Sequence, residues 1–307
     1  MELDKMESSL LKAIADLDGV PTGAFSLRKN GKPVMVNITP SVNIVPKEGK
    51  PGIDIFVRAQ SVGETVYIPV VVTDSGVDDM VYNDFYIGKN ADVLIVAGCG
   101  IHNDGCDDSK HNGIHRFFLD EGAKVKYVEK HYGEGNGTGK RILDPITEAT
   151  MGKNSTMEME TVQIKGVDST VRTTNATLAE GAHLLISEKI MTHAEQTAET
   201  RFTVSLDGEG SSVHVVSRSV ATEKSTQKFV SMVYGNAKCY GHVECDAIIM
   251  DAGRVISIPQ IEANCVDANL IHEAAIGKIA GEQLTKLMTL GLTEKEAETE
   301  IINGFLR

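Results

Sequence analysis

The chain has 307 residues, and its 30 Lys and Arg stand against 43 Asp and Glu, so the formal net charge is −13. This length suits one large domain or two, and 41% apolar with 24% charged residues excludes wholesale disorder. The acidic balance argues against nucleic acid or an anionic membrane as a partner, because both bind clustered Lys and Arg. The sequence lacks an apolar run of roughly 18 residues and a signal-peptide layout, so a cytoplasmic protein is expected.

Residues 1–50 predict a small N-terminal α/β cap. Apolar residues first recur every three to four positions, which predicts a helix that the Asp18–Pro21 segment stops (Leu3, Met6, Leu10, Ile14, Leu17). Apolar and polar residues then alternate on both sides of Asn30-Gly31. This pair predicts a β-hairpin with a type I′ turn, because both central positions of that turn need φ > 0.

Residues 51–269 contain many short β-rich runs and hardly any helical periodicity. Several runs open with a glycine, and these glycines recur along the whole segment (Gly88, Gly122, Gly181, Gly210, Gly235, Gly253). Each interval between them suits one irregular coil of a solenoid, except the longest, from Gly122 to Gly181, which could be two turns. The pairs of turn residues typical of hairpins are scarce, so a parallel β-helix is favoured over a β-sandwich.

Residues 270–307 return to a helical period and predict a C-terminal helical domain. One amphipathic helix is indicated by apolar residues that precede Gly291 (Ile276, Ile279, Leu284, Leu287, Met288). Thr293 and Glu296 form a capping box for a second helix, which Gly304 ends. Short helices with an exposed apolar stripe often dock on partner proteins.

Five cysteines in a cytosolic chain are more consistent with free, reactive or metal-binding thiols than with a disulfide framework. The densest group of possible ligands is a segment with two thiols and three imidazoles (Cys99, His102, Cys106, His111, His115). It looks like a zinc or iron site, but its spacing matches no zinc finger or ribbon. A polar loop with incidental histidines is an equal alternative.

The Gly133–Arg141 segment superficially resembles a phosphate-binding loop. Glu134 stands where the first glycine belongs, and Arg141 replaces the Mg²⁺-binding hydroxyl. A flexible linker is the better interpretation. The sequence shows no self-contained catalytic apparatus, so no catalytic residue is assigned.

A second thiol-rich stretch runs from Cys239 to Ile279. If Cys245 lies in one coil and His272-Glu273 end the next, these side chains could be neighbours, because coils stack about 4.8 Å apart. A thiolate with a carboxylate or an imidazole can hold iron loosely. Alternatively, Cys245 is a small buried apolar residue of a strand.

The same stretch strongly resembles the SufB/SufD family of iron–sulfur cluster assembly scaffolds, through the segments GHVECDAII, IPQIEA and IHEAAIGKIAGEQLTKLMTLGLTEKEAETEIINGFL. The likeness covers most of residues 50–307 and is to the short scaffolds of minimal systems. It implies a right-handed parallel β-helix core and a C-terminal helical domain. It also implies that Cys245 is the scaffold thiol, that Glu273 is its acidic partner, and that His272 matches the histidine of SufD-type subunits.

The resemblance therefore implies a scaffold, not an enzyme, that binds a transient iron–sulfur cluster through Cys245, His272 and Glu273. A second tier of candidate ligands is Cys239, Glu244, Cys265, Cys99, His102 and Cys106. The implied partners are a SufC-type ABC ATPase at the C-terminal helices, a second copy of the chain along the β-helix, a sulfur donor and apo-protein recipients. Two alternatives remain, namely a zinc-dependent enzyme using the Cys99–His115 loop and a purely structural β-solenoid module.

Overall fold

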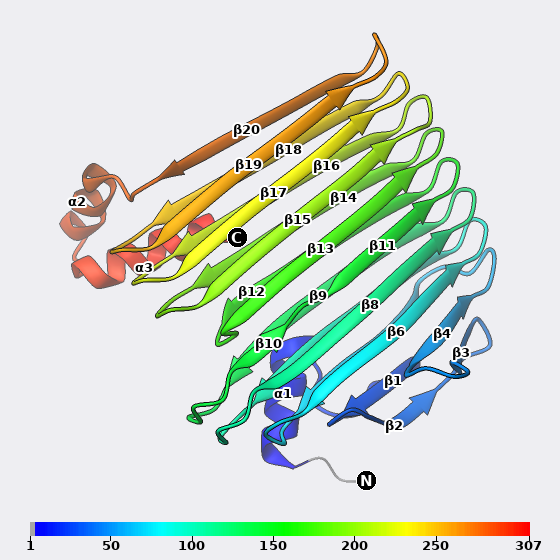
Figure 1. The fold of residues 1–307 in the computed structure, drawn as a ribbon, viewed down its shortest axis with the longest axis horizontal. Helices are drawn as coiled ribbons and strands as arrows, with labels where there is room; N and C mark the ends of the chain where they lie inside the picture. The colour runs from blue at the N-terminus through cyan, green and yellow to red at the C-terminus, as the bar shows by residue number, and fades with distance from the viewer. Residues whose placement is uncertain (1–3) are drawn as a thin grey trace.

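The computed structural model describes residues 4–307, and its fold is a β-solenoid of about eight turns with 57% of its residues in strands. The predicted parallel β-helix is confirmed. Figure 1 shows the coils stacked side by side from the N-terminal to the C-terminal end. Most coils contribute one strand to each of two ten-stranded sheets.

The first sheet has the order β2-β1-β5-β7-β9-β12-β14-β16-β18-β20. Its strands are β1 (Ala24–Lys29), β2 (Lys32–Asn37), β5 (Glu64–Val72), β7 (Asp92–His102), β9 (Lys124–Glu134), β12 (Thr156–Lys165), β14 (His183–Thr192), β16 (Ser212–Ala221), β18 (Tyr240–Ile249) and β20 (Asn269–Gly277). The second sheet runs from β19 to β3 and consists of β3 (Val42–Pro46), β4 (Gly52–Val57), β6 (Asp78–Ile87), β8 (Ser109–Leu119), β10 (Arg141–Leu143), β11 (Ile146–Met151), β13 (Ser169–Leu178), β15 (Thr197–Leu206), β17 (Thr226–Gly235) and β19 (Arg254–Ala263).

The length of a coil follows from the parallel pairing of the first sheet. His183 pairs with Ser212, and these two residues are 29 residues apart in the chain. Ser212 pairs in turn with Tyr240, and Tyr240 with Asn269, so the next two coils have nearly the same length. The predicted interval from Gly181 to Gly210 has the same length as the coil from His183 to Ser212.

Two other glycine intervals need a different interpretation. Lys124 pairs with Thr156 and Thr156 with His183, so the segment from Gly122 to Gly181 spans two coils, as expected. The interval from Gly235 to Gly253 is not a coil. Gly235 ends β17 and Gly253 precedes β19, and these strands are adjacent in the second sheet.

The core fills the space between the two sheets, where every second side chain of a strand points. Phe85 and Phe117 stack there with ring centroids 4.3 Å apart and interplanar angle 4°, and neither ring is exposed. Their neighbours along the chain, Tyr86 and Phe118, stack in the same way on the outer surface. Because the parallel strands pair in register, aromatic side chains of successive coils stack on both faces of the second sheet.

The N-terminal helix α1 (Lys5–Ala15) covers the outer face of the first sheet, against β5, β7 and β9. It begins at the capping box of Asp4 and Glu7 and ends before the predicted stop at Asp18. Leu3, predicted to belong to it, lies outside the described residues. Gly98 of β7 permits the close approach, since a Cβ there would lie 2.5 Å from the carbonyl oxygen of Ile14.

Both sheets end in a short antiparallel strand at the N-terminal end. The predicted hairpin is confirmed as β1 and β2, with Asn30 at φ 46° and Gly31 at φ 76°. Strand β1 pairs in parallel with β5, and β3 ends the second sheet by pairing with β4. The cap is therefore continuous with the β-solenoid.

The C-terminal end is built differently. Strands β19 and β20 are the last of their sheets, and no strand within residues 4–307 pairs with their outer edges. Ile276, predicted to lie in a helix, is in β20, and helix α2 (Gly281–Thr289) starts only after it. Helix α3 (Glu294–Phe305) begins at the predicted capping box of Thr293 and Glu296. Among residues 4–307, none of the helices has the length and apolarity to cross a membrane.

The segment from Gly133 to Lys140 is not the predicted flexible linker. It stacks on the turn of the preceding coil, where the Gly137 and Gly139 amides donate to the carbonyls of Asn103 and Gly105, both at 3.1 Å. A Cβ at Gly137 or Gly139 would lie 2.2 or 2.1 Å from a backbone oxygen. The glycines thus permit two backbones to stack closely, and they form no phosphate cradle.

Phe117→Ala should lower the free energy of unfolding by about 3–5 kcal/mol, because it opens a cavity inside the ring ladder. Phe118→Ala is the matched control, since this ring is 36% exposed, and it should cost about 1 kcal/mol or less. Urea unfolding followed by circular dichroism measures both. Equal losses in the two variants would contradict the assignment of the core to the inner faces.

Candidate functional site

Strand β18 places the predicted scaffold thiol Cys245 on the inner face of the next-to-last strand of the first sheet. Burial alternates along β18, and Cys245 is 2% exposed. Its neighbours in the pairing register are Ser217 of β16 and Ala274 of β20. Only one strand therefore separates this thiol from the open end of the solenoid.

The surroundings of Cys245 keep its thiol protonated at neutral pH. Burial raises the pKa of Cys245 to about 11, against an opposing effect of the Ser257 hydroxyl. Ser257 belongs to β19 across the core, and its buried hydroxyl has no other hydrogen-bond partner among the described residues. The negative charge of Glu188 raises the pKa further. Coordination of iron by this sulfur must therefore release a proton.

The two other predicted ligands lie on opposite faces of β20. His272 pairs with the inward-facing Val243, so it shares the inner face with Cys245. From the strand spacing and rise, the Cα atoms of Cys245 and His272 are roughly 8 Å apart. Glu273 pairs with Glu244 and points outward. One copy of the chain thus brings Cys245 and His272 together and holds Glu273 on the other side of the sheet.

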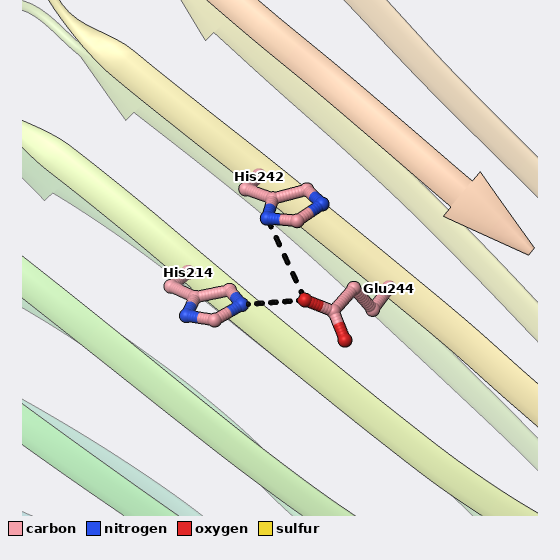
Figure 2. Close-up of side chains that lie close together, drawn as sticks. All are labelled: His214, His242 and Glu244. Atoms are coloured by element: carbon pink, nitrogen blue, oxygen red, sulfur yellow. Dashed lines mark hydrogen bonds and ion pairs between the residues drawn. The ribbon is translucent and has the colours of Figure 1, made fainter.

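The second-tier cysteines of this region lie away from Cys245. Cys239 and Cys265 occupy the turns that precede β18 and β20 on consecutive coils. Burial raises the pKa of Cys239, and the nearby Cys265 adds to this effect. The extended chain between Cys239 and Cys245 spans roughly 20 Å. Glu244 lies on the outer face, beside His214 and His242 (Figure 2).

The predicted Cys99–His115 site is not assembled. The segment is the end of β7, an exposed turn with Cys106, and the first half of β8. Cys99 is buried on the inner face of β7, whereas His102 contacts Asp104 at 2.9 Å and Glu134 at 3.3 Å. Cys99 and His102 thus lie on opposite sides of the chain, and the five residues do not converge.

A buried polar network, which sequence reasoning missed, occupies the interior beside Cys99. Arg172 of β13 forms an ion pair with Glu129 of β9, and its Nη2 lies 3.2 Å from Nδ1 of His131. The Tyr127 hydroxyl donates to Glu129 at 3.0 Å and lies 2.7 Å from His115 Nδ1. All five side chains are at most 6% exposed. They come from strands of both sheets that are far apart in sequence.

Burial and the Arg172–Glu129 ion pair set the protonation states of this network. Burial alone would raise the pKa of Glu129, but the adjacent Arg172 guanidinium holds it well below its usual range. Burial lowers the pKa of His115 to about 4 and also lowers that of His131, so both imidazoles are neutral. Burial raises the pKa of the Cys99 thiol. The permanent charge of the Arg172 guanidinium beside these groups disfavours a divalent cation among them.

The polar row continues through the interior toward Cys245. Arg172 Nε lies 3.9 Å from Glu188 of β14, whose carboxylate accepts hydrogen bonds from Thr200 at 2.8 Å and Ser217 at 2.7 Å. Ser217 is the register neighbour of Cys245. A line of buried polar side chains therefore connects the Glu129 region with Cys245.

Residues 77–305 match the family model described as the SufBD core domain of the SUF system for FeS cluster assembly. The chain belongs to this family. The match contains the last coils, Cys245, His272 and both C-terminal helices, and it confirms the SufB/SufD resemblance.

Curated relatives carry the same family name. An iron-sulfur cluster assembly SufBD family protein of Pyrococcus horikoshii is 26% identical over 316 residues, which cover 98% of this chain and 94% of the relative. Two such proteins of Methanothermobacter thermautotrophicus, from strains Winter and Delta H, are 27% and 26% identical, over 76% and 84% of this chain. The matches span 57% and 63% of those two relatives, which is less than two thirds of their length.

Folding stability should fall in acid because His115 is buried as a neutral ring. Its folded-state pKa of about 4 lies below the unfolded value of 6.5, so the unfolded chain binds the extra proton between these pH values. Stability is full above pH 6.5 and falls by about 3 kcal/mol toward pH 4. His115→Gln should remove this share of the pH dependence in urea titrations, whereas the exposed His183→Gln should not. Parallel pH profiles of wild type and His115→Gln would contradict the assignment.

Proposed function

We propose that this chain is a scaffold subunit on which a nascent iron–sulfur cluster is built and then passed to recipient proteins. The observation that carries the proposal is the position of Cys245 and His272 within a SufBD core. Both lie on the inner face of the last two strands of the first sheet, where the solenoid is open. The cluster is cargo on this scaffold, which works in the cytoplasm and receives sulfur from a donor protein.

The ligand types suit a cluster that must leave again. Thiolates, imidazoles and carboxylates drawn from two copies of the chain would form a set of mixed softness, whereas four thiolates are the usual ligands of a resident cluster. Cys245 must also lose its proton before it binds iron, since its pKa is about 11. Reprotonation of the sulfur would assist release of the cluster.

A second copy of the chain would complete the site. Within residues 4–307, the outer edges of β19 and β20 present unpaired backbone groups, which folded proteins cover or pair. Ile261 and Ile276 pair with the inward-facing Val233 and Ala247, yet they remain 43% and 40% exposed. These side chains face the core, and they are exposed because β19 and β20 are the last strands of their sheets. A twofold dimer through this end would cover both edges and bring two sets of Cys245, His272 and Glu273 near one interface.

Helix α2 is the proposed docking surface for a SufC-type ABC ATPase, in which ATP hydrolysis would take place. Helix α3 is anchored on the solenoid, with Leu306 buried and Arg218 bonded to the Phe305 carbonyl at 3.4 Å. Met288 and Leu290, in contrast, are 45% and 75% exposed. Only residues 278–280 connect α2 to β20, the strand of His272 and Glu273. Movement of the ATPase could therefore reach the cluster site through a short connection.

Cys245→Ala should abolish most cluster assembly while the fold remains intact, because the side chain sits in a strand where Ala occupies nearly the same space. Anaerobic reconstitution with iron and sulfide, followed by visible absorption, measures the loss. Cys239→Ala is the matched control, since it removes another buried thiol of the same region, and it should assemble cluster normally. Assembly at the wild-type rate in Cys245→Ala would contradict the assignment.

Replacing Met288 and Leu290 together by Glu should weaken capture of the ATPase at least tenfold, because two charges would enter an apolar contact. A pull-down with the purified ATPase measures the change. Val62→Glu is the control, since Val62 is 76% exposed and lies near the N-terminal end. Undiminished capture by the double variant would place the dock elsewhere.

A further inference from the structure

The outer face of the first sheet carries two histidines and a glutamate in contact, on the side of β18 opposite to Cys245. His214 extends from β16, and His242 and Glu244 extend from β18 (Figure 2). His214 Nε2 lies 3.0 Å and His242 Nδ1 lies 3.5 Å from the same Glu244 oxygen. The parallel register stacks the two imidazoles, with centroids 5.1 Å apart and planes at 2°.

This arrangement has the chemistry of a metal site. One ligand atom from each of the three residues lies within 4.8 Å of the other two, the only such group among residues 4–307. Metal bonds to His nitrogen and carboxylate oxygen are about 2.0–2.2 Å, which puts neighbouring ligand atoms roughly 3–3.5 Å apart. The distances of 3.0 and 3.5 Å to Glu244 match that spacing. Two imidazoles and one carboxylate suit divalent ions such as Fe²⁺ and Zn²⁺.

The second ring nitrogen of His242 suits the outer shell of such a site. Its side chain is only 18% exposed, and its Nε2 is buried without a hydrogen-bond partner among the described residues. The nearest acidic group on that side is Glu273, whose oxygen lies 3.8 Å away. With a cation on Nδ1, the Nε2 atom carries the ring proton and faces the Glu273 carboxylate, which is the usual kind of outer-shell partner of a metal-bound histidine.

We propose that His214, His242 and Glu244 bind one divalent transition-metal ion of the Fe²⁺ and Zn²⁺ class. An ion can reach the site, because His214 also lines an open groove of about 390 Å³ on the outer face. The three residues and Cys245 project from opposite faces of the sheet. Metal binding here uses neither Cys245 nor His272 and does not rest on the proposed function.

Anaerobic titration of the full chain with Co²⁺ tests the proposal. We expect one equivalent of Co²⁺ to bind. The visible absorption of the bound Co²⁺ should be that of nitrogen and oxygen ligands, without a thiolate-to-metal charge-transfer band. His214→Ala and Glu244→Gln should each weaken binding more than about 100-fold, beyond the 10–100-fold effect typical of outer-shell partners. Cys245→Ala should bind normally. His183→Ala is the matched control, because His183 lies on the same face of β14 and is bonded to Ser212.

Absence of Co²⁺ binding would overturn the proposal and leave His214 and Glu244 as an ordinary ion pair. Binding that survives both His214→Ala and Glu244→Gln, or that shows thiolate charge transfer and is lost in Cys245→Ala, would also overturn it. Circular dichroism and thermal unfolding of each variant establish that the fold is retained. Failure of cluster assembly in any variant leaves this result unchanged, since the readout is Co²⁺ bound without sulfide.

Discussion

Each coil of a β-solenoid is stable only when another layer covers its strand edges, and this constraint organises the whole molecule. At the N-terminal end, the short strands β2 and β3 pair antiparallel to the sheets, and α1 covers the outer face. At the other end, the long parallel strands β19 and β20 are themselves the edges. Because the two ends differ in this way, the long edges of β19 and β20 lie next to Cys245 and His272. The architecture thus concentrates potential contacts with a partner at the site of the proposed chemistry.

The alternation of side chains along a strand separates two kinds of ligands. On β18, Cys245 points into the core while Glu244 and His242 point out, although they are neighbours in sequence. Burial keeps the thiol protonated, whereas the outer residues can reach water. A shift of the register by one residue would exchange the two sets. The precise pairing of β16, β18 and β20 is therefore as important for function as the residues themselves.

Much of the fold could be predicted from the sequence, because local patterns determine it. The Asn30-Gly31 turn, the capping box at Thr293 and the spacing of Gly122 and Gly181 all correspond to features of the structure. Alternation predicts that adjacent residues face opposite sides, and this rule separates His272 from Glu273. The expectation that Cys245, His272 and Glu273 of one chain bind together did not take this alternation into account.

The interior could not be predicted in the same way. Arg172 and Glu129 are 43 residues apart, and their ion pair depends on how two sheets face each other. The proximity of His214 and His242 likewise depends on the length of the coil between them, since a single inserted or deleted residue would turn one ring away. Such contacts between coils are set by the exact length of every turn, which sequence periodicity gives only approximately.

Hydrogen exchange at β20 tests the central claim that a second copy covers the open end of the solenoid. Amides of β20 that point away from β18 have no strand partner within residues 4–307 of a single chain. The account predicts that they are protected at concentrations where clusters assemble and that dilution removes this protection. The amides that point toward β18 serve as the internal reference, because they are bonded in either state. Rapid exchange of the outward amides at every concentration, with the reference amides protected, would contradict the account.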